Sequence, residues 1–164
     1  MNIIRGVAVI VVALVLTVPI ATAQQQCLAD AWKAFNEKNY SGAISSTDDC
    51  IQNFGAKATR EQAALEAAHE KQPPTGAVDN AFDKKKINDR WAVNDVSTSY
   101  FVKGQSAEYL MKSSKSSKDK QKYKEMACSA YQSASRLTYG RCWDPKGWFW
   151  SPAEAANDHL SVCN

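Results

Sequence analysis

The chain has 164 residues, of which 45% are hydrophobic and 23% are charged, and its formal net charge is +3. This length suits one ordinary domain with a single core. So small a net charge does not indicate nucleic-acid binding, and we expect no nucleic-acid partner.

The N-terminal residues 1–23 have the features of a secretory signal peptide. Arg5 gives a positive start, an apolar run covers residues 7–18, and Ala21-Thr22-Ala23 is a small-x-small cleavage site. A signal peptide would direct the remaining chain to the periplasm or the exterior.

The alternative is a retained membrane anchor, because residues 6–23 carry no charge and are just long enough to cross a bilayer. Pro19, followed by the cleavage pattern, favours the signal peptide. We therefore expect residues 24–164 to form a single exported domain without stable membrane insertion.

The hydrophobic pattern of the mature chain predicts an all-α fold of about six to seven helices. Apolar residues recur three and four positions apart, and no window shows the sustained alternation of half-buried strands. The first helix covers about 27–38, and the second covers about 42–53 and ends at Gly55. Because so short a turn joins them, these two helices must pack antiparallel as a hairpin.

The next helices are predicted from capping signals and breaks. Residues 59–62, Thr-Arg-Glu-Gln, have the pattern of a capping box that starts a helix. This helix continues to about Lys71, before Pro73-Pro74 stops it. The following segment, 75–86, predicts one short helix and a loop.

Two long helices and a short terminal one complete the prediction. One helix covers about 88–112, and after a serine-rich break at 113–117 another continues to about Leu137. Ser151 is a good cap, Pro152 suits the first helical position, and Glu154 completes a capping box. The last helix therefore begins at Pro152 and runs to about Val162.

Between the last two helices lies an aromatic segment, GRCWDPKGWFWSP, at residues 140–152. Asp144 to Gly147 suits a β-turn, since proline fixes the second position and glycine tolerates positive φ. The tryptophans either close the end of the helical stack or form a surface for a partner or a sugar. We favour the structural corner. On an extended strand Trp148 and Trp150 share one side and Phe149 takes the other, so at least one ring points inward.

Three stretches of the sequence resemble a known family. AFNEKNYSGAISSTDDCI (34–51) has the aromatic and small-residue spacing of a tetratricopeptide repeat, and NDVSTSYFVKGQSAEYL (94–110) with KYKEMACSAYQSASRL (122–137) is a second partial match. With CWDPKGWFWSPAEAA (142–156), the chain resembles a group of exported bacterial proteins with a degenerate repeat region and a Cys-Trp-Asp-Pro segment. The resemblance implies an α-α superhelix of stacked hairpins that binds partners.

Five cysteines in an exported chain predict two disulfides and one remaining thiol. In the first hairpin, Cys27 and Cys50 lie at similar distances from the turn near Tyr40. Antiparallel packing therefore brings these two cysteines together.

The same symmetry about the loop near Pro145 pairs Cys128 with Cys163 and leaves Cys142 as the free thiol. The alternative pairing is Cys142 with Cys163, which needs the final helix to fold back on its own start. A further alternative is that the cysteines stay unpaired as small buried hydrophobes.

The sequence offers little for catalysis. His69 and His159 are its two histidines, and it holds no GxSxG, HExxH, Walker or CxxC motif. His159 and Cys163 have a spacing that could ligate zinc, but no second pair completes the site, so a surface or helix-terminal histidine is favoured. We therefore expect no enzyme activity, no metal and no cofactor.

Stacked helical hairpins usually bind proteins or peptides, so we expect a periplasmic adaptor. The candidate partner-binding residues are polar-tipped or aromatic, namely Tyr100, Lys103, Tyr131, Arg136, Trp148 and Trp150. The alternative function is a cell-wall carbohydrate binder or hydrolase that uses the tryptophan-rich segment 143–150, with Trp148 and Trp150 as its platform.

Overall fold

The computed structural model describes residues 20–164. Their elements are α1 (Ile20–Asn36), α2 (Tyr40–Ala67), α3 (Ala81–Asp89), α4 (Trp91–Ser113), α5 (Ser117–Ser135), β1 (Cys142–Asp144), β2 (Trp148–Trp150), α6 (Pro152–Asp158) and the 3-10 helix η1 (Leu160–Cys163). The predicted all-α class is confirmed, with a small β-hairpin that the hydrophobic pattern did not predict. Most of the predicted signal peptide lies outside the described residues, and its last residues, 20–23, begin α1.

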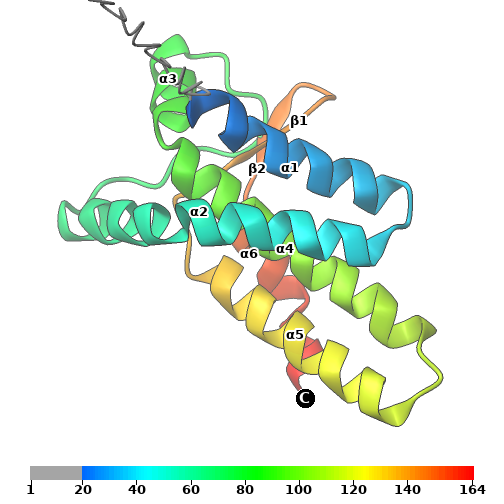
Figure 1. Cartoon of the computed structure of the whole chain (residues 1–164). Coiled ribbons are helices and arrows are strands. Elements are labelled where there is room, and N and C mark those ends of the chain that lie inside the picture. The colour runs from blue at the N-terminus through cyan, green and yellow to red at the C-terminus, as the bar shows by residue number, and fades with distance from the viewer. Residues whose placement is uncertain (1–19) are drawn as a thin grey trace, which may run out of the picture.

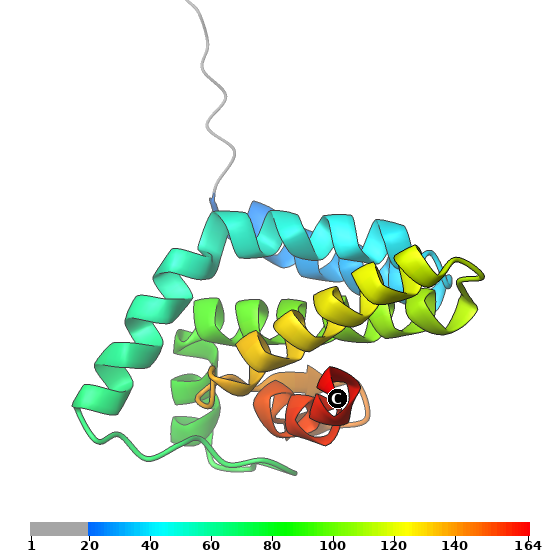
Figure 2. The same cartoon turned by 90° about the horizontal axis from the view of Figure 1, so that it is seen from below.

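The helices form three layers. The antiparallel pair α1 and α2 makes the first layer, the antiparallel pair α4 and α5 makes the second, and α6 with the hairpin makes the third (Figures 1 and 2). The antiparallel hairpin predicted at the N-terminal end of the chain is therefore present. None of the helices in the described part of the chain has the length and hydropathy needed to span a bilayer.

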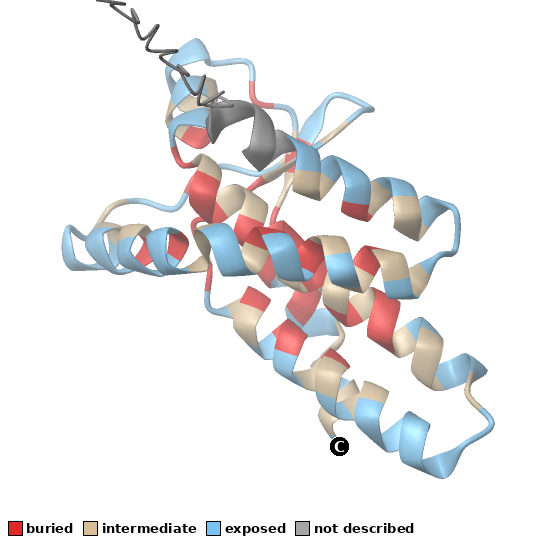
Figure 3. Cartoon of the chain, in the orientation of Figure 1, coloured by how far each residue is buried: buried red, intermediate tan, exposed pale blue. Residues whose placement is uncertain are grey.

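Helix α4 is the centre of the core and packs against α1, α2, α5 and α6. The buried residues gather along it, whereas the outer helices are buried on one side only (Figure 3). Val93 and Val96 face the α2 side of the core, and Phe101 and Ala107 face α5 and α6. A helix that is apolar on several faces must lie inside the domain, which explains its central position.

Helix α2 differs from the prediction because it runs through Gly55 without ending there. It bends in its middle, and its second half turns away from α1 (Figure 2). The Thr59 hydroxyl donates to the Gly55 carbonyl at 3.0 Å, so Thr59 is bonded inside a helix and does not cap one. Glycine and threonine back-bonding are both associated with helix bends. The predicted break is therefore a bend, and the predicted capping box is wrong.

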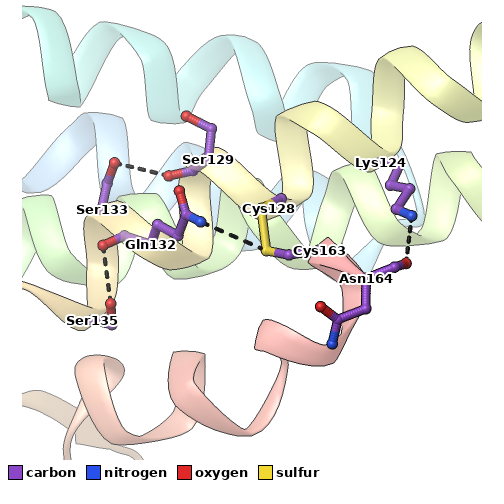
Figure 4. The surroundings of a disulfide bond; sticks show 8 residues. All are labelled: Lys124, Cys128, Ser129, Gln132, Ser133, Ser135, Cys163 and Asn164. Carbon is purple, nitrogen blue, oxygen red and sulfur yellow. Dashed lines mark hydrogen bonds between the residues drawn. A yellow bond between two sulfur atoms is a disulfide. The ribbon is translucent and has the colours of Figure 1, made fainter.

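One disulfide lies within the first layer, and the other joins the second layer to the C-terminal residues after α6. Cys27 is bonded to Cys50 with a Cα–Cα distance of 5.6 Å, and Cys128 to Cys163 with one of 5.1 Å. Both pairings agree with the prediction. In Figure 4 the second bond joins α5 to the C-terminal residues, and the Lys124 ammonium donates to the Asn164 carbonyl beside it at 2.5 Å.

The β-hairpin forms around the predicted turn. The Gly147 amide donates to the Asp144 carbonyl at 2.9 Å, and Gly147 has φ of +103°, which glycine adopts without strain. The Asp144 carboxylate also accepts from the Lys146 amide at 2.8 Å. After β2, the Ser151 hydroxyl accepts from the Glu154 amide at 3.2 Å, so the predicted cap of the last helix is present.

Candidate functional site

A cleft of about 690 Å³ opens between the second half of α1, the start of α4 and the β-hairpin. We call it the tryptophan-lined cleft. Its walls come from segments that are far apart in the sequence. They include Trp32 from α1, Trp91 and Asp95 from α4, and Cys142, Trp143 and Phe149 from the hairpin.

Aromatic rings form two walls of the tryptophan-lined cleft and are supported by other rings. Trp91 packs edge-on against Phe54 of α2, with 5.4 Å between the ring centroids. In the β-hairpin, the Trp143 ring of β1 packs edge-on against the Phe149 ring of β2, with 4.9 Å between the ring centroids. Trp143 is nevertheless 49% exposed. Ring-on-ring support holds these large side chains in place while leaving aromatic surface open to a ligand.

The polar floor of the cleft joins α4 to the segment before β1. The Asn94 amide group donates to the Ile87 carbonyl at 2.7 Å, and its oxygen accepts from the Arg141 backbone amide at 2.9 Å. The Thr98 hydroxyl donates to the Asn94 carbonyl at 2.7 Å. The bond between Asn94 and Arg141 fixes the segment before β1 on α4, and the other two bonds fix Asn94 and Thr98. The floor of the cleft is therefore formed before any ligand binds.

Arg141 anchors the hairpin from below. It is only 4% exposed, and its guanidinium donates to the backbone carbonyls of Pro73, Thr138 and Gly140. Its contact with the Pro74 carbonyl is longer, at 3.3 Å. Burial lowers the pKa of Arg141, but an arginine stays charged at any physiological pH. Its hydrogen-bonding capacity is used by the backbone, so Arg141 is a structural residue of the cleft.

Cys142 is the free cysteine that the prediction left over, and its thiol lines the cleft. Burial is the main cause that raises its pKa to about 11, and the nearby carboxylates of Asp95 and Asp144 act in the same direction. The thiol is therefore protonated at neutral pH and is a poor nucleophile. The alternative bond from Cys142 to Cys163 is wrong, because Cys163 is bonded to Cys128.

The predicted platform of Trp148 and Trp150 is not formed. Phe149 points inward and is 6% exposed, as the alternation along the strand predicted. Trp148 is 40% exposed near the hairpin tip, but the Trp150 ring packs edge-on against Phe101 of α4 at 5.2 Å. Trp150 therefore serves the core, and the two tryptophans do not present a common flat surface.

The other predicted binding residues fall on two different sides of α4. Tyr100 and Arg136 line a groove of about 620 Å³ between the second half of α2 and the end of α5, which we call the α2–α5 groove. Lys103 lies one turn after Tyr100, and its ammonium contacts the Asp48 carboxylate at 2.5 Å. Burial raises the pKa of Tyr100, and the charge of Asp48 adds to this effect. These three residues therefore share one surface.

Tyr131 is not part of that surface, and its prediction as a binding residue is wrong. Its side chain is 0% exposed, because α5 turns this face towards α4 and α6. Its hydroxyl donates to the Glu108 carboxylate at 2.9 Å, and its ring stacks on His159 at 4.8 Å. Helical spacing in the sequence assigns Tyr131 to one face of its helix, but it does not show whether that face is buried or exposed.

His159 ends α6 and lies 3.0 Å from the Glu108 carboxylate, so the expected helix-terminal histidine is confirmed. Cys163, its possible partner in a zinc site, is consumed by a disulfide. Where side chains are described, no cluster of three metal-ligating groups is present.

Sequence reasoning missed the contributions of Trp32 and Trp91 to the cleft. Both residues fall within predicted helices, over 27–38 and 88–112, and neither is among the predicted binding residues. The one sequence signal was that tryptophan is a rare residue type. The chain has five tryptophans, and three of them line this cleft. Rarity alone does not say which of them meet.

No protein-family model matches the chain, and neither the curated proteins nor the solved structures compared with it give a match. The resemblance to exported repeat proteins therefore stays a prediction. The function of the tryptophan-lined cleft must be argued from its own geometry.

Proposed function

We propose that this chain is an exported, non-catalytic binding module that holds a peptide or protein partner in the tryptophan-lined cleft. The observation that carries the proposal is the convergence of Trp32, Trp91 and Trp143 on one cleft of about 690 Å³. Concave sites lined by aromatic side chains with a few polar groups are typical of ligand binding. Tryptophan is also enriched among the residues that dominate binding energy at protein interfaces.

Export to an oxidising compartment is supported by the two disulfides, because such bonds persist mainly in exported proteins. The signal-peptide pattern of residues 1–23 is consistent with this location. The bond from Cys27 to Cys50 also holds the middle of α1 against α2, next to the α1 residues that form one wall of the cleft. A wall that is covalently fixed lowers the ordering cost of binding.

Binding without catalysis is supported by the state of the cleft's reactive groups. The Cys142 thiol is kept protonated by burial, which raises its pKa to about 11. The Arg141 guanidinium is engaged by backbone carbonyls. These two groups therefore contribute shape and rigidity.

A carbohydrate ligand is the second candidate, because Trp143 and Trp148 are both exposed on the hairpin, at 49% and 40%. Exposed indole rings can stack on sugars. Only Trp143 lines the cleft, however, so the two functions make different demands on Trp148.

The test compares Trp143→Ala with its matched control Trp148→Ala. Each variant and the parent protein is crosslinked in the exporting cell, and neighbours identified by mass spectrometry are produced and titrated against the purified proteins. The cleft proposal expects binding to be lost in Trp143→Ala and kept in Trp148→Ala. Equal loss in both, together with retention of the parent on peptidoglycan or glucans, would favour the carbohydrate reading.

The α2–α5 groove is tested in parallel, because Tyr100, Lys103 and Arg136, three of the predicted adaptor residues, lie on that side. A triple alanine variant at these positions should keep the captured partner if the tryptophan-lined cleft is the site. Loss of the partner in the triple variant alone would move the binding site to the groove and refute the cleft.

A further inference from the structure

The β-hairpin has one covered edge and one open edge. On the covered edge, the Phe149 amide donates to the Gly76 carbonyl at 2.9 Å, and the Gly76 amide donates to the Phe149 carbonyl at 2.7 Å. Both backbone groups of Phe149 therefore point away from β1. Because antiparallel pairs alternate, Phe149 and its partner Trp143 form a non-hydrogen-bonded pair.

It follows that the N–H and C=O of Trp143 point out of the hairpin on the opposite edge. Within residues 20–164, no backbone hydrogen bond from outside the hairpin reaches Trp143. Its carbonyl has only a long contact, 3.8 Å, with the thiol of the adjacent Cys142. An unpaired strand edge of this kind is a template for another strand.

This open edge borders the tryptophan-lined cleft, since Arg141, Cys142 and Trp143 all line it. The edge is also rigid, because Arg141 is bonded to the carbonyls beneath it and the turn is closed by the Asp144 to Gly147 bond. A strand added here would place alternate side chains into the cleft, while its backbone pairs with β1.

Two carboxylates beside the open edge determine which side chains an added strand should carry. Asp95 lines the cleft, and Asp144 lies two residues after Cys142, on the same face of β1. Both carboxylates lie close enough to influence the Cys142 thiol. The positive charge of Arg141 is held below, against backbone carbonyls. The Trp91 ring already has the Lys57 ammonium over its face, 3.8 Å from the centroid. The exposed Trp143 ring, together with the two carboxylates, favours a basic side chain on the hairpin side of the cleft.

We infer that the partner of the tryptophan-lined cleft binds as an extended peptide that adds a strand to the open edge of β1 and carries a lysine or arginine beside Asp95 and Asp144. This inference rests on the proposed function and makes it specific. The peptide would form the outer strand of a small sheet whose other members are β1, β2 and the segment at Gly76.

The experiment uses random linear peptides displayed on phage, selected on the full exported chain and counter-selected on Trp143→Ala. The enriched peptide is synthesised and its affinity is measured by tryptophan fluorescence. Single N-methyl groups are then introduced along its backbone, since each removes one amide donor. The inference expects binding to weaken about five- to tenfold at every second position, as one lost hydrogen bond predicts.

A second arm examines the protein's own backbone. Hydrogen exchange at the Trp143 amide should slow when the peptide binds.

The charge arm replaces Asp95 or Asp144 by asparagine and expects weaker binding of the basic peptide at low salt, with a smaller difference at high salt. Peptides that bind in the cleft but tolerate N-methylation at every position, without protection of the Trp143 amide, would overturn the strand inference and leave the proposed function intact. Enrichment of no cleft-dependent peptide would overturn both.

Discussion

Tyr131 shows how a single residue can organise the interior. It is the largest fully buried side chain among the described residues, and its ring lies directly over Gly104 of α4. A Cβ atom at Gly104 would lie 2.6 Å from the Tyr131 ring, which is closer than real contacts allow. The missing side chain at Gly104 therefore sets how closely α4 and α5 approach.

Replacing Gly104 by alanine should lower the free energy of unfolding by about 1–3 kcal/mol, because the buried ring has nowhere to move. Gly55→Ala is the matched control, since a Cβ there meets only Ile51 at an ordinary 3.7 Å. The control should stabilise α2 by about 0.5–1 kcal/mol through helix propensity. Urea denaturation measures both, and equal effects would contradict the close-packing argument.

Glu108 is the second residue whose environment has a measurable consequence. Burial acts to raise its pKa, but hydrogen bonds from Lys112, Tyr131 and His159 outweigh burial and hold the pKa below its usual value of 4.5. A carboxylate with a lowered pKa stabilises the folded state above its unfolded pKa. That stabilisation is lost as the pH falls through the folded pKa.

We therefore predict that acid destabilises the protein partly through Glu108. In Glu108→Gln the free energy of unfolding should be lower at pH near 7 and should fall less between neutral pH and about pH 3 than in the parent. Glu37→Gln, at an exposed position, controls for the loss of one carboxylate. Parallel pH curves for the parent and Glu108→Gln would exclude this role.

Among the elements, covalent bonds tie α1 to α2 and α5 to η1. The disulfides enclose sequence separations of 23 and 35 residues. The bond from Cys128 to Cys163 holds a C-terminal segment made only of the short α6 and η1, which has little apolar surface of its own. Isolated helices of this length are not stable in water, so the helical conformation of α6 and η1 depends on their attachment to α5.

Replacing Cys128 and Cys163 together by serine should cost about 2–4 kcal/mol of unfolding free energy. The same change at Cys27 and Cys50 should cost slightly less, by about 0.4 kcal/mol, in the loop-entropy account. Guanidinium denaturation of each double variant under oxidising conditions gives both values. Peptide mapping of the parent should find Cys142 as the one thiol alkylated without reductant after unfolding, and a second such thiol would contradict the pairings.

At the scale of the whole molecule, the segment between α5 and β1 ties the layers together. The Tyr139 hydroxyl donates to the Glu70 carbonyl at 2.5 Å, and the Tyr139 amide donates to the Gln62 side chain at 3.2 Å. Two residues later, Arg141 reaches the carbonyl of Pro73 and is bonded through its own amide to Asn94. This short connection therefore holds α2, the loop after it, and α4 in one arrangement.

Arg141→Lys should lower the free energy of unfolding by about 2–4 kcal/mol, because lysine lacks the planar fork that serves several carbonyls at once. The hairpin is the element that this change loosens first. Ligand affinity of the cleft should fall even in conditions where the variant remains folded, as titration with the selected peptide would show. Unchanged stability and affinity would mean that Arg141 does not anchor the hairpin.

Several features could be predicted because they depend on neighbours in sequence. The Ser151 cap, the turn from Asp144 to Gly147 and the antiparallel first hairpin all follow from local signals. The disulfide pairings followed from the same hairpins, since residues equidistant from a tight turn must meet. The bend at Gly55 was interpreted as an end, because a glycine in a helix weakens it without specifying whether the chain continues.

The sequence by itself determined the helical class and the positions of most helices and favoured the observed pairing of four cysteines, because hydrogen bonding and short connections act within about one turn or one hairpin. Only the tertiary structure decided that Tyr131 is internal, that Trp150 supports Phe101, and that three distant tryptophans share a cleft. Those facts depend on how the three layers are rotated and stacked. Layer geometry is set by the packing of many side chains at once, and no short stretch of sequence contains it.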